Sequence, residues 1–342
     1  MVLSIILIIV GFLFLIKGAD FLVDGSSAVA KRFKIPEMVI GLTIVAMGTS
    51  MPELVVSLTS ALEGHSDIAL GNVIGSNIAN VLLILGICAL MKEINIPKAT
   101  RRIENPLCLI VTVVLFALCL NGGASKIISQ KEGALLLLLF VGYLIYLFIV
   151  AKKNGKQNEA EPENAFMNTT GTVENVKLEL DKNKEEIESS KRFFINILKI
   201  VIGIVALKYG ADFVVDNAVN IAHIIGISEK IIGVTIIAVG TSLPELVSSV
   251  TAVAKGENDM AVGNIVGSNI FNILLILGVS SSISPINYST SYNFDMIYLI
   301  VTGALLAIFP YIGKGTRALD RAEGFVFVAM YVGYISCLLF VV

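Results

Sequence analysis

The chain alternates between long apolar stretches and short polar breaks, a pattern typical of a protein that crosses a membrane several times. A helix needs about 20 mostly apolar residues to cross a bilayer, and the chain supplies many such stretches. The pattern predicts an all-α integral membrane protein with ten transmembrane helices. The predicted spans are residues 2–22, 37–62, 68–91, 105–120, 133–151, 193–214, 229–254, 260–283, 293–310 and 322–342.

The composition supports a membrane protein and argues against several other classes. Apolar residues make up 56% of the 342 residues, whereas a soluble chain usually has about 45–50%. The first stretch carries Lys17 and Asp20 and lacks a small-residue cleavage site, so it is predicted to be a span and not a signal peptide. A net charge of −2 argues for no nucleic-acid partner. No cofactor and no obligatory protein partner are evident.

Polar residues 152–191 separate two halves, 1–151 and 192–342, and are predicted to be a linker without a folded domain of its own. Lysine and arginine favour the cytoplasmic side of short loops. With the N-terminus outside, the short inner loops hold 11 of these residues and the outer loops hold 3. We therefore expect a multi-pass protein of the cell membrane, with both termini outside and the linker in the cytoplasm.

The two halves contain a repeat. Residues 41–87 align without a gap with residues 233–279, at an offset of 192, and 28 of the 47 positions are identical. One copy covers most of the second and third predicted spans, and the other covers most of the seventh and eighth, so the two copies cross the membrane in opposite directions. Inverted repeats of this kind are the architecture of many secondary transporters. The pattern predicts two inverted five-helix repeats.

Each copy places a carboxylate near the middle of a span, Glu53 in the first and Glu245 in the second. An ionisable residue within a span costs about 2.5–3.5 kcal/mol and therefore needs a local reason. No lysine or arginine lies within either span to neutralise it. Small hydroxyl residues share the helix sector of each carboxylate, which predicts an oxygen-lined ion site, although such a stripe also serves helix packing.

Prolines sharpen this prediction. Pro52 and Pro244 stand one residue before the two carboxylates, and proline cannot donate the usual backbone hydrogen bond within a helix. The helix should therefore loosen near residues 46–49 and 238–241, leaving carbonyl oxygens free to bind cations. The third and eighth spans add oxygen ligands on one sector each. These are Asn72, Ser76, Asn77 and Asn80, and Asn264, Ser268, Asn269 and Asn272.

Carboxylate, amide and hydroxyl oxygens are hard ligands that suit Na⁺ and Ca²⁺. These spans contain no cysteine thiolate or histidine ligand beside the carboxylates, which argues against transport of zinc, copper or iron. Two negative charges balance one Ca²⁺ and would also hold two or three Na⁺. Competition for overlapping ligands would couple the two ions in an antiporter.

The doubled motif resembles the two α-repeats of the sodium/calcium exchanger family, within the cation/calcium antiporter superfamily. The resemblance rests on segments 46–53 (AMGTSMPE) and 75–80 (GSNIAN), and on segments 238–245 (AVGTSLPE) and 267–272 (GSNIFN). The short linker makes the chain most similar to the compact prokaryotic members. The resemblance implies antiport of Na⁺ against Ca²⁺ by alternating access, with the first and sixth spans sliding against the rest, and no enzymatic activity.

The resemblance also implies a set of ion ligands. Calcium would bind the carboxylates of Glu53 and Glu245 and the backbone carbonyls of Thr49 and Thr241. The implied sodium ligands are Ala46, Thr49, Ser50, Glu53 and Ser76, with the symmetric set Ala238, Thr241, Ser242, Glu245 and Ser268. Asn80 and Asn272 would complete the centre. Asp20 and Asp212 match between the repeats and are either functional or simple helix caps.

One position departs from part of the family. Some members, including potassium-dependent ones, carry aspartate where this chain has Asn272, so we expect electrogenic exchange without potassium. A proton/calcium antiporter of the same fold is the main alternative. A passive cation channel and an intramembrane hydrolase built on Ser50 and Glu53 are further alternatives, although no histidine lies near that serine.

Overall fold

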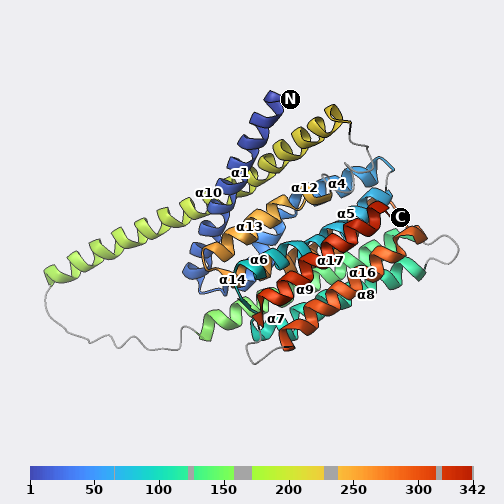
Figure 1. Cartoon of the computed structure of the whole chain (residues 1–342). Helices are drawn as coiled ribbons and strands as arrows, with labels where there is room; N and C mark the ends of the chain where they lie inside the picture. Colours follow the sequence, from blue (N-terminus) through green and yellow to red (C-terminus); the bar gives the residue numbers. More distant parts are fainter. Residues whose placement is uncertain (65, 122–126, 158–171, 227–237, 313–317, 341–342) are drawn as a thin grey trace.

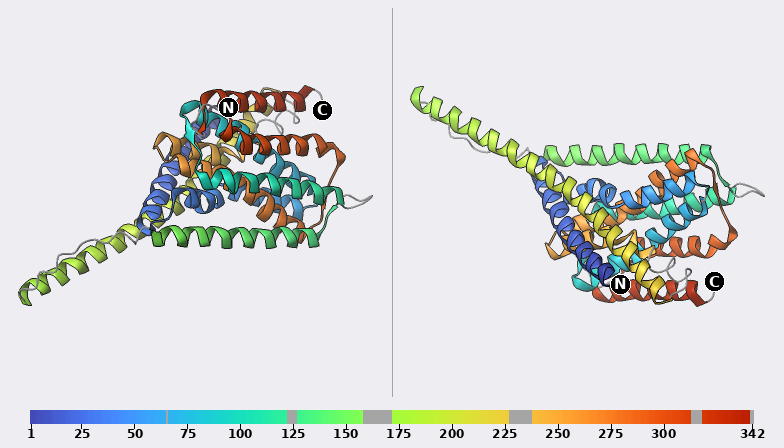
Figure 2. Two further views of the ribbon diagram at one scale, coloured as in Figure 1. Left: turned by 90° about the horizontal axis from the view of Figure 1, so that it is seen from below. Right: turned by 90° about the horizontal axis from the view of Figure 1, so that it is seen from above.

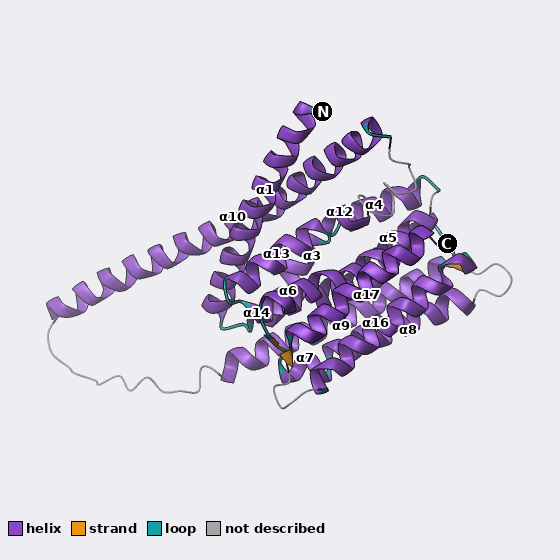
Figure 3. Ribbon diagram, viewed as in Figure 1, coloured by secondary structure: helices purple, strands orange, loops and turns teal. Residues whose placement is uncertain are grey.

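A computed structural model describes every residue of the chain except 65, 122–126, 158–171, 227–237, 313–317 and 341–342. Eight of the described helices are long and apolar enough to cross a membrane, and a ninth span is the broken pair Glu37–Thr49 and Met51–Leu62, bent by 48°. The remaining predicted span, 229–254, is the seventh in chain order; it begins outside the described residues, and its described part includes the apolar helix Leu243–Ala254. The architecture agrees with the predicted all-α membrane fold (Figure 3).

The first half of the chain contains helices of α and π type and two short strands. In order they are α1 Val2–Phe33, α2 Glu37–Ile40, η1 Gly41–Val45, α3 Ala46–Thr49, α4 Met51–Leu62, α5 Ser66–Ile78, η2 Ala79–Leu85, α6 Gly86–Met91, β1 Ile94–Asn95, α7 Lys98–Arg102, α8 Glu104–Asn121, β2 Ile127–Ile128 and α9 Gln130–Gln157. The described elements of the second half repeat this order: α10 Thr172–Ile224, α12 Ala238–Gly240, α13 Leu243–Ala254, α14 Asn258–Phe271, η4 Asn272–Leu277, α15 Gly278–Ile283, β3 Ile286–Asn287, η5 Thr290–Tyr292, α16 Asn293–Ile308, η6 Phe309–Tyr311, β4 Ala318–Leu319 and α17 Arg321–Phe340.

Two predicted spans are longer than expected. The first was predicted to end at residue 22, but α1 continues to Phe33. Its last turns contain small polar residues that lower the hydropathy, yet Ser26 and Ser27 are buried against other helices, and packing sustains the helix there. The sixth span continues back into the predicted linker as the single 53-residue helix α10, which extends well beyond the bundle (Figure 2).

The two halves interlock, and several of the contacts between them come in pairs related by the repeat. Helix α17 packs against α6, and α9 packs against α15. Strand β1 pairs antiparallel with β4, and β2 pairs antiparallel with β3, so that Ile94 lies opposite Leu319 and Ile286 opposite Ile128. Neither half therefore builds its interior alone, and the spans that carry the repeated motif end up at the centre.

Helices α1 and α10 lie side by side and cross closely (Figure 1). A Cβ atom added to Gly11 would lie 2.8 Å from the carbonyl oxygen of Gly210, and one added to Gly203 would lie 2.7 Å from that of Gly18. Any larger residue at these positions would push the two backbones apart. Glycine at matching positions of both helices thus allows a tight antiparallel pair at the edge of the bundle.

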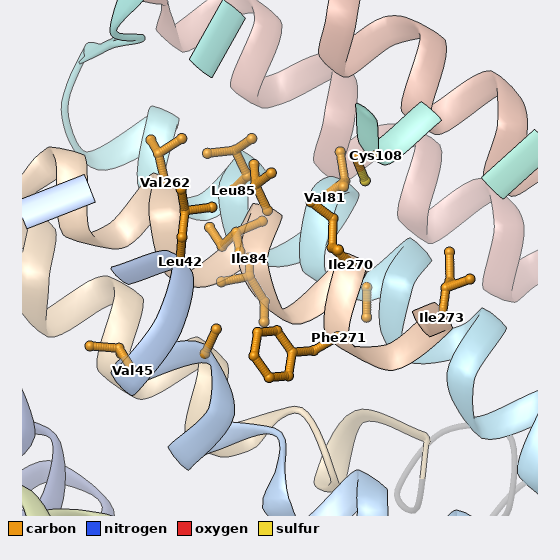
Figure 4. Close-up of a cluster of buried hydrophobic side chains, with 14 of the residues drawn as sticks. Leu42, Val45, Val81, Ile84, Leu85, Cys108, Val262, Ile270, Phe271 and Ile273 are labelled. Carbon is orange, nitrogen blue, oxygen red and sulfur yellow. The ribbon is translucent and has the colours of Figure 1, made fainter. Parts of the chain in front are cut away.

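The core surrounds the two repeated motifs. In spans 68–91 and 258–283, 78% and 89% of the most apolar stretch of 18 residues is buried inside the protein. These shares are larger than in the other unbroken spans that the structure describes. Glycine again permits close approach between helices. A Cβ atom added to Gly263 would lie 2.6 Å from the carbonyl oxygen of Met38, so a larger residue there would push the helices apart. Leu42, Ile84, Val262 and Phe271 form part of the buried cluster drawn in Figure 4.

Candidate cation-binding centre

Two helix breaks place the carboxylates at the centre of the bundle. Ser50 leaves the helical backbone between α3 and α4, with φ −83° and ψ 9°, and Ser242 does the same before α13, with φ −88° and ψ 7°. Each following helix has its proline in the first two positions, where the missing N–H costs nothing. The loosening predicted at residues 46–49 lies one residue later, because Ala46–Thr49 keeps one α-helical turn. A π-helical turn precedes it at Gly41–Val45.

Glu53 and Glu245 lie in the first turns of α4 and α13, and only 1% of either residue is exposed. The N-terminus of a helix stabilises a nearby negative charge. Within the described part of the chain, neither carboxylate forms an ion pair with a basic side chain. Burial of two carboxylates without a basic partner is costly unless a cation accompanies them.

Hydrogen bonds from the opposite repeat hold one oxygen of each carboxylate. The Ser50 hydroxyl donates to Oε1 of Glu245 over 2.8 Å, and the Ser242 hydroxyl donates to Oε1 of Glu53 over 3.5 Å. The other oxygen, Oε2, is buried in both residues and has no hydrogen-bond partner among the residues that the structure describes. Each repeat therefore orients the carboxylate of the other and leaves one acceptor of each free.

Four further oxygens of the predicted site residues are buried and lack a partner among the described residues, and they too come in matched pairs. They are the hydroxyl oxygens of Ser76 and Ser268 and the amide oxygens Oδ1 of Asn80 and Asn272. All four residues are at most 1% exposed. Buried polar atoms are almost always hydrogen-bonded, so six unpartnered oxygens contributed by three symmetric residue pairs call for an explanation. A set of hard oxygen acceptors of this kind can coordinate Na⁺ or Ca²⁺.

Two asparagines connect the broken helices. Thr49 donates to Oδ1 of Asn264 over 3.1 Å, and Asn264 donates to the hydroxyl oxygens of Ser248 and Ser249 over 3.0 and 2.9 Å. In the other half, Thr241 donates to Asn72, which in turn donates to the carbonyl of Glu53 over 3.3 Å. The threonine side chains are thus held by the opposite repeat, which leaves the backbone carbonyls of Thr49 and Thr241 as their available ligand atoms.

The structure brings most of the predicted site residues together. Ala46 is fully buried next to Gly267, whereas the side chain of Ala238 lies outside the described part of the chain. Asn72 and Asn264, expected among the ligand oxygens, serve instead as bridges between helices. Sequence reasoning missed the pairing between repeats, because a helical wheel shows which residues share a face but not which helix that face meets.

The capping alternative for Asp20 and Asp212 is wrong, since both lie within long helices. Asp20 forms an ion pair with Lys255 at 3.0 Å, and Asp212 forms one with Lys208 of its own helix at 2.6 Å. Both aspartates are far more exposed than the central carboxylates. They belong to the ends of the molecule and not to its centre.

Comparison with known proteins decides the family. The sequence profile described as "Sodium/calcium exchanger protein" matches residues 3–149 and 195–340, which is most of the chain. The chain belongs to the sodium/calcium exchanger family. It is therefore a multi-pass membrane antiporter that exchanges Ca²⁺ for another cation, and not an enzyme, as the resemblance of its motifs implied.

Relatives in this family cover the chain from end to end. The chain is 37% identical over 336 residues to the putative antiporter CaxA of Alkalimonas amylolytica, with 98% of each chain covered. It is 34% identical over 360 residues to the sodium/calcium exchanger MaX1 of Methanosarcina acetivorans, again with 98% of each covered. The solved structure of the sodium-calcium exchanger NCX_Mj superposes with a TM-score of 0.77 at 29% identity, covering 98% of both chains. The chain thus has the compact prokaryotic form of the family.

Proposed function

We propose that this family member exchanges Na⁺ for Ca²⁺ at the central site. The observation that carries the proposal is the set of six unpartnered buried oxygens from Glu53, Glu245 and their neighbours. A bound cation would supply a partner for these two carboxylates and four neutral oxygens, which are otherwise costly to bury in a low-dielectric interior. The proposed ligands are Ala46, Thr49, Ser50, Glu53, Ser76, Asn80, Ala238, Thr241, Ser242, Glu245, Ser268 and Asn272.

The charge of this site suggests the coupling. Two carboxylates neutralise one Ca²⁺, and the same oxygens can hold more than one Na⁺ when Ca²⁺ is absent. Because the two ions share ligands, they exclude each other, and each drives the other across the membrane. The proposed exchange is electrogenic, with more than two Na⁺ per Ca²⁺, and independent of potassium, because Asn272 is neutral.

The proposed movement is alternating access by α1 and α10 against the remaining helices. Gly11, Gly18, Gly203 and Gly210 allow these two helices to cross at backbone contact, which supports their moving as one body. The division into repeats 1–151 and 192–342 with the linker 152–191 is part of the same proposal. Repeats that rock or slide around a fixed site are common among secondary transporters.

The proposed location is the cell membrane, with both termini outside and the linker in the cytoplasm. The distribution of lysine and arginine supports this orientation. The first turns of α1 and the last described turns of α17 lie on the side of the bundle away from the extension of α10 (Figure 1), which agrees with an even number of spans.

Radioactive calcium uptake into proteoliposomes tests the exchange. Vesicles loaded with Na⁺ and diluted into Na⁺-free buffer should accumulate Ca²⁺, and equal Na⁺ on both sides should abolish the uptake. Potassium on either side should have no effect beyond the membrane potential. Uptake driven by an outward proton gradient but not by Na⁺ would replace the proposal by proton/calcium antiport. Uptake without any counter-ion would indicate a channel.

A further inference from the structure

Four asparagines form a hydrogen-bonded ring where α5 and α14 meet, next to the proposed site. Asn77 donates through Nδ2 to the backbone carbonyl of Asn269 over 3.2 Å, and Asn269 donates to the carbonyl of Asn77 over the same distance. Both residues are buried, with at most 1% exposed. The two amides therefore bind the two repeats to each other reciprocally.

These bonds fix which way each amide points. A backbone carbonyl only accepts hydrogen bonds, so the group facing it must be Nδ2, and Oδ1 must point the other way. Oδ1 of Asn77 accepts from Nδ2 of Asn272 over 2.9 Å, and Oδ1 of Asn269 accepts from Nδ2 of Asn80 over 3.0 Å. Amide orientation is normally ambiguous, but turning any of the four amides here would bring two acceptors or two donors together.

The consequence falls on the ion site. Since Asn80 and Asn272 must use Nδ2 toward the ring, their Oδ1 atoms are directed away from it, and these are two of the unpartnered buried oxygens. Asn77 and Asn269 contribute no ligand atom of their own. They nevertheless ensure that Asn80 and Asn272 offer oxygen, and not NH₂, to a cation.

The ring also constrains the charge at position 272. A carboxylate has no hydrogen to donate, so an ionised aspartate there would place an acceptor against Oδ1 of Asn77. Asn77 cannot turn to meet it, because Nδ2 is committed to the carbonyl of Asn269. Only a neutral donor, either asparagine or a protonated aspartic acid, satisfies Asn77.

We propose that Asn77 and Asn269 are positioning residues that set the orientation of Asn272 and Asn80, so that each of these presents Oδ1 to the ion. This inference rests on the proposed function, because it concerns ligands of the proposed site. It explains why the chain matches a neutral residue at position 272 with an asparagine at position 77 of the opposite repeat.

A double-mutant cycle in proteoliposome uptake assays tests the positioning. Asn77→Ala should raise the KM for Ca²⁺ about tenfold, as expected when an ion ligand loses the buried hydrogen bond between neutral amides that orients it. Asn272→Ala should do the same. The double variant should resemble the single variants, because Asn77 acts through Asn272. Full additivity of the two effects, or an unchanged KM in Asn77→Ala, would overturn the proposal.

The symmetric pair supplies a second measurement that does not depend on the folding of Asn77→Ala. Asn269→Ala should raise the KM for Ca²⁺ by a similar factor, because Nδ2 of Asn80 then loses its acceptor. Asn80→Ala should do the same, and the double variant of Asn80 and Asn269 should resemble the single variants. An unchanged KM in Asn269→Ala contradicts the proposal. Failure of the proposed function is distinct, since wild type itself would then show no sodium-driven uptake.

Discussion

The centre of the molecule is symmetric, whereas its ends are not. At the centre, Glu53 and Glu245 share the same burial and the same kind of serine partner from the opposite repeat. At the end where α13 meets α14, Lys255 forms ion pairs with Asp20 and Asp24 of α1, at 3.0 and 2.8 Å. The residue that corresponds to Lys255 in the first repeat is Glu63, which is exposed.

A second contact strengthens the same end. Glu257 accepts hydrogen bonds from Ser27 over 2.7 Å and from Lys31 over 3.2 Å, and both residues lie in α1. We call Asp20, Asp24, Ser27, Lys31, Lys255 and Glu257 the Lys255 cluster. Its counterpart cannot form in the other repeat, because Glu63 would face Asp212 and Asp216 if the same contacts were made there.

This difference separates two tasks. We expect a symmetric centre to offer the same ligands to an ion arriving from either side of the membrane. We expect the asymmetric ends to bias which side is open at rest, because the ion pairs of Lys255 hold α1 against the second repeat at one end. Each such partly exposed pair contributes only about 0.2–1 kcal/mol, which is enough to bias an equilibrium between two conformations but not to lock it.

The largest expected effect is on the symmetric centre. Glu53→Gln and Glu245→Gln should each abolish sodium-driven calcium uptake, because either change leaves one negative charge against a divalent ion. The effects should be equal, as the equal surroundings of the two residues require. Glu63→Gln and Glu93→Gln are matched controls at exposed positions and should retain wild-type flux. Near-normal flux in a correctly inserted central variant would falsify the assignment of the site.

Charge reversal at the ends should act on one side only. Lys255→Glu removes two ion pairs and creates repulsion between carboxylates. It should therefore increase, by roughly tenfold, the fraction of protein molecules in which that end is accessible to the label. Glu63→Lys, the mirror change, should favour closure of the opposite end by a smaller factor. Labelling of single cysteines placed at each end with an impermeant maleimide measures both. Equal behaviour of the two variants would show that the ends are equivalent after all.

Restoring the charge order tests whether Lys255 acts through α1. Asp24→Lys in the Lys255→Glu background should recover a large part of the wild-type labelling, since it rebuilds one ion pair with the charges exchanged. Asp216→Lys should fail to do so, because Asp216 corresponds to Asp24 in the other repeat and lies outside the Lys255 cluster. Rescue by Asp216→Lys would mean that net charge, and not the contact, determines accessibility.

Membrane potential should change the rate by a moderate factor. If the sodium-loaded centre is positive and the calcium-loaded centre is neutral, potential acts on the difference at up to about 2.3 kcal/mol per charge per 100 mV. Calcium uptake driven by internal Na⁺ should therefore accelerate when the vesicle interior is made positive. Uptake that ignores the potential in valinomycin-clamped vesicles would establish two Na⁺ per Ca²⁺, or protons as counter-ion.

The smallest effect concerns pH at the Lys255 cluster. Hydrogen bonds from Glu37, Ser27 and Lys31 hold the pKa of Glu257 below its ordinary value of 4.5. Burial opposes the charge of Lys255, but Asp24 and Asp20 outweigh it and raise its pKa above 10.5. A lowered carboxyl pKa favours the contact above the ordinary value and a raised lysine pKa favours it below, so Glu257 and Lys255 both keep their charges from about pH 5 to pH 10. The hydrogen bond from Glu37 exists only while the Glu37 carboxyl carries a proton, so accessibility at this end should rise with pH in the wild type and stay constant in Glu37→Gln. Wild-type accessibility that does not change with pH, measured by cysteine labelling, would contradict this.

The sequence predicted the membrane fold, the inverted order of the elements and the burial of the central carboxylates, because hydropathy and the repeat record them directly. It could not predict the course of each helix. On a straight helix Thr43 would share a sector with Glu53, but the π-helical turn at Gly41–Val45 and the bend at Ser50 intervene, and the Thr43 hydroxyl donates to the carbonyl of Val39. A straight helical wheel cannot represent a broken helix.

Contacts between helices were also beyond the sequence. The repeat indicated that Asn77 and Asn269 correspond, but not that they bind each other. Asp20 correctly stood out by matching Asp212, yet its partner, Lys255, lies 235 positions along the chain. Such long-range pairs depend on how the helices are assembled, which no local pattern of hydrophobic and polar residues specifies.

The reciprocal bonds of the centre have a consequence for the origin of the chain. When a residue of one half bonds to a residue of the other half, the two repeat-related residues make the same bond in return, as Asn77 and Asn269 do. This is the isologous geometry of a two-fold homodimer. A half-length ancestor inserted in both orientations could have formed the whole central site from two copies. Fusion into one polypeptide then freed the two copies to diverge, and a lysine at position 255 opposite a glutamate at position 63 became possible only in a chain whose halves are encoded separately.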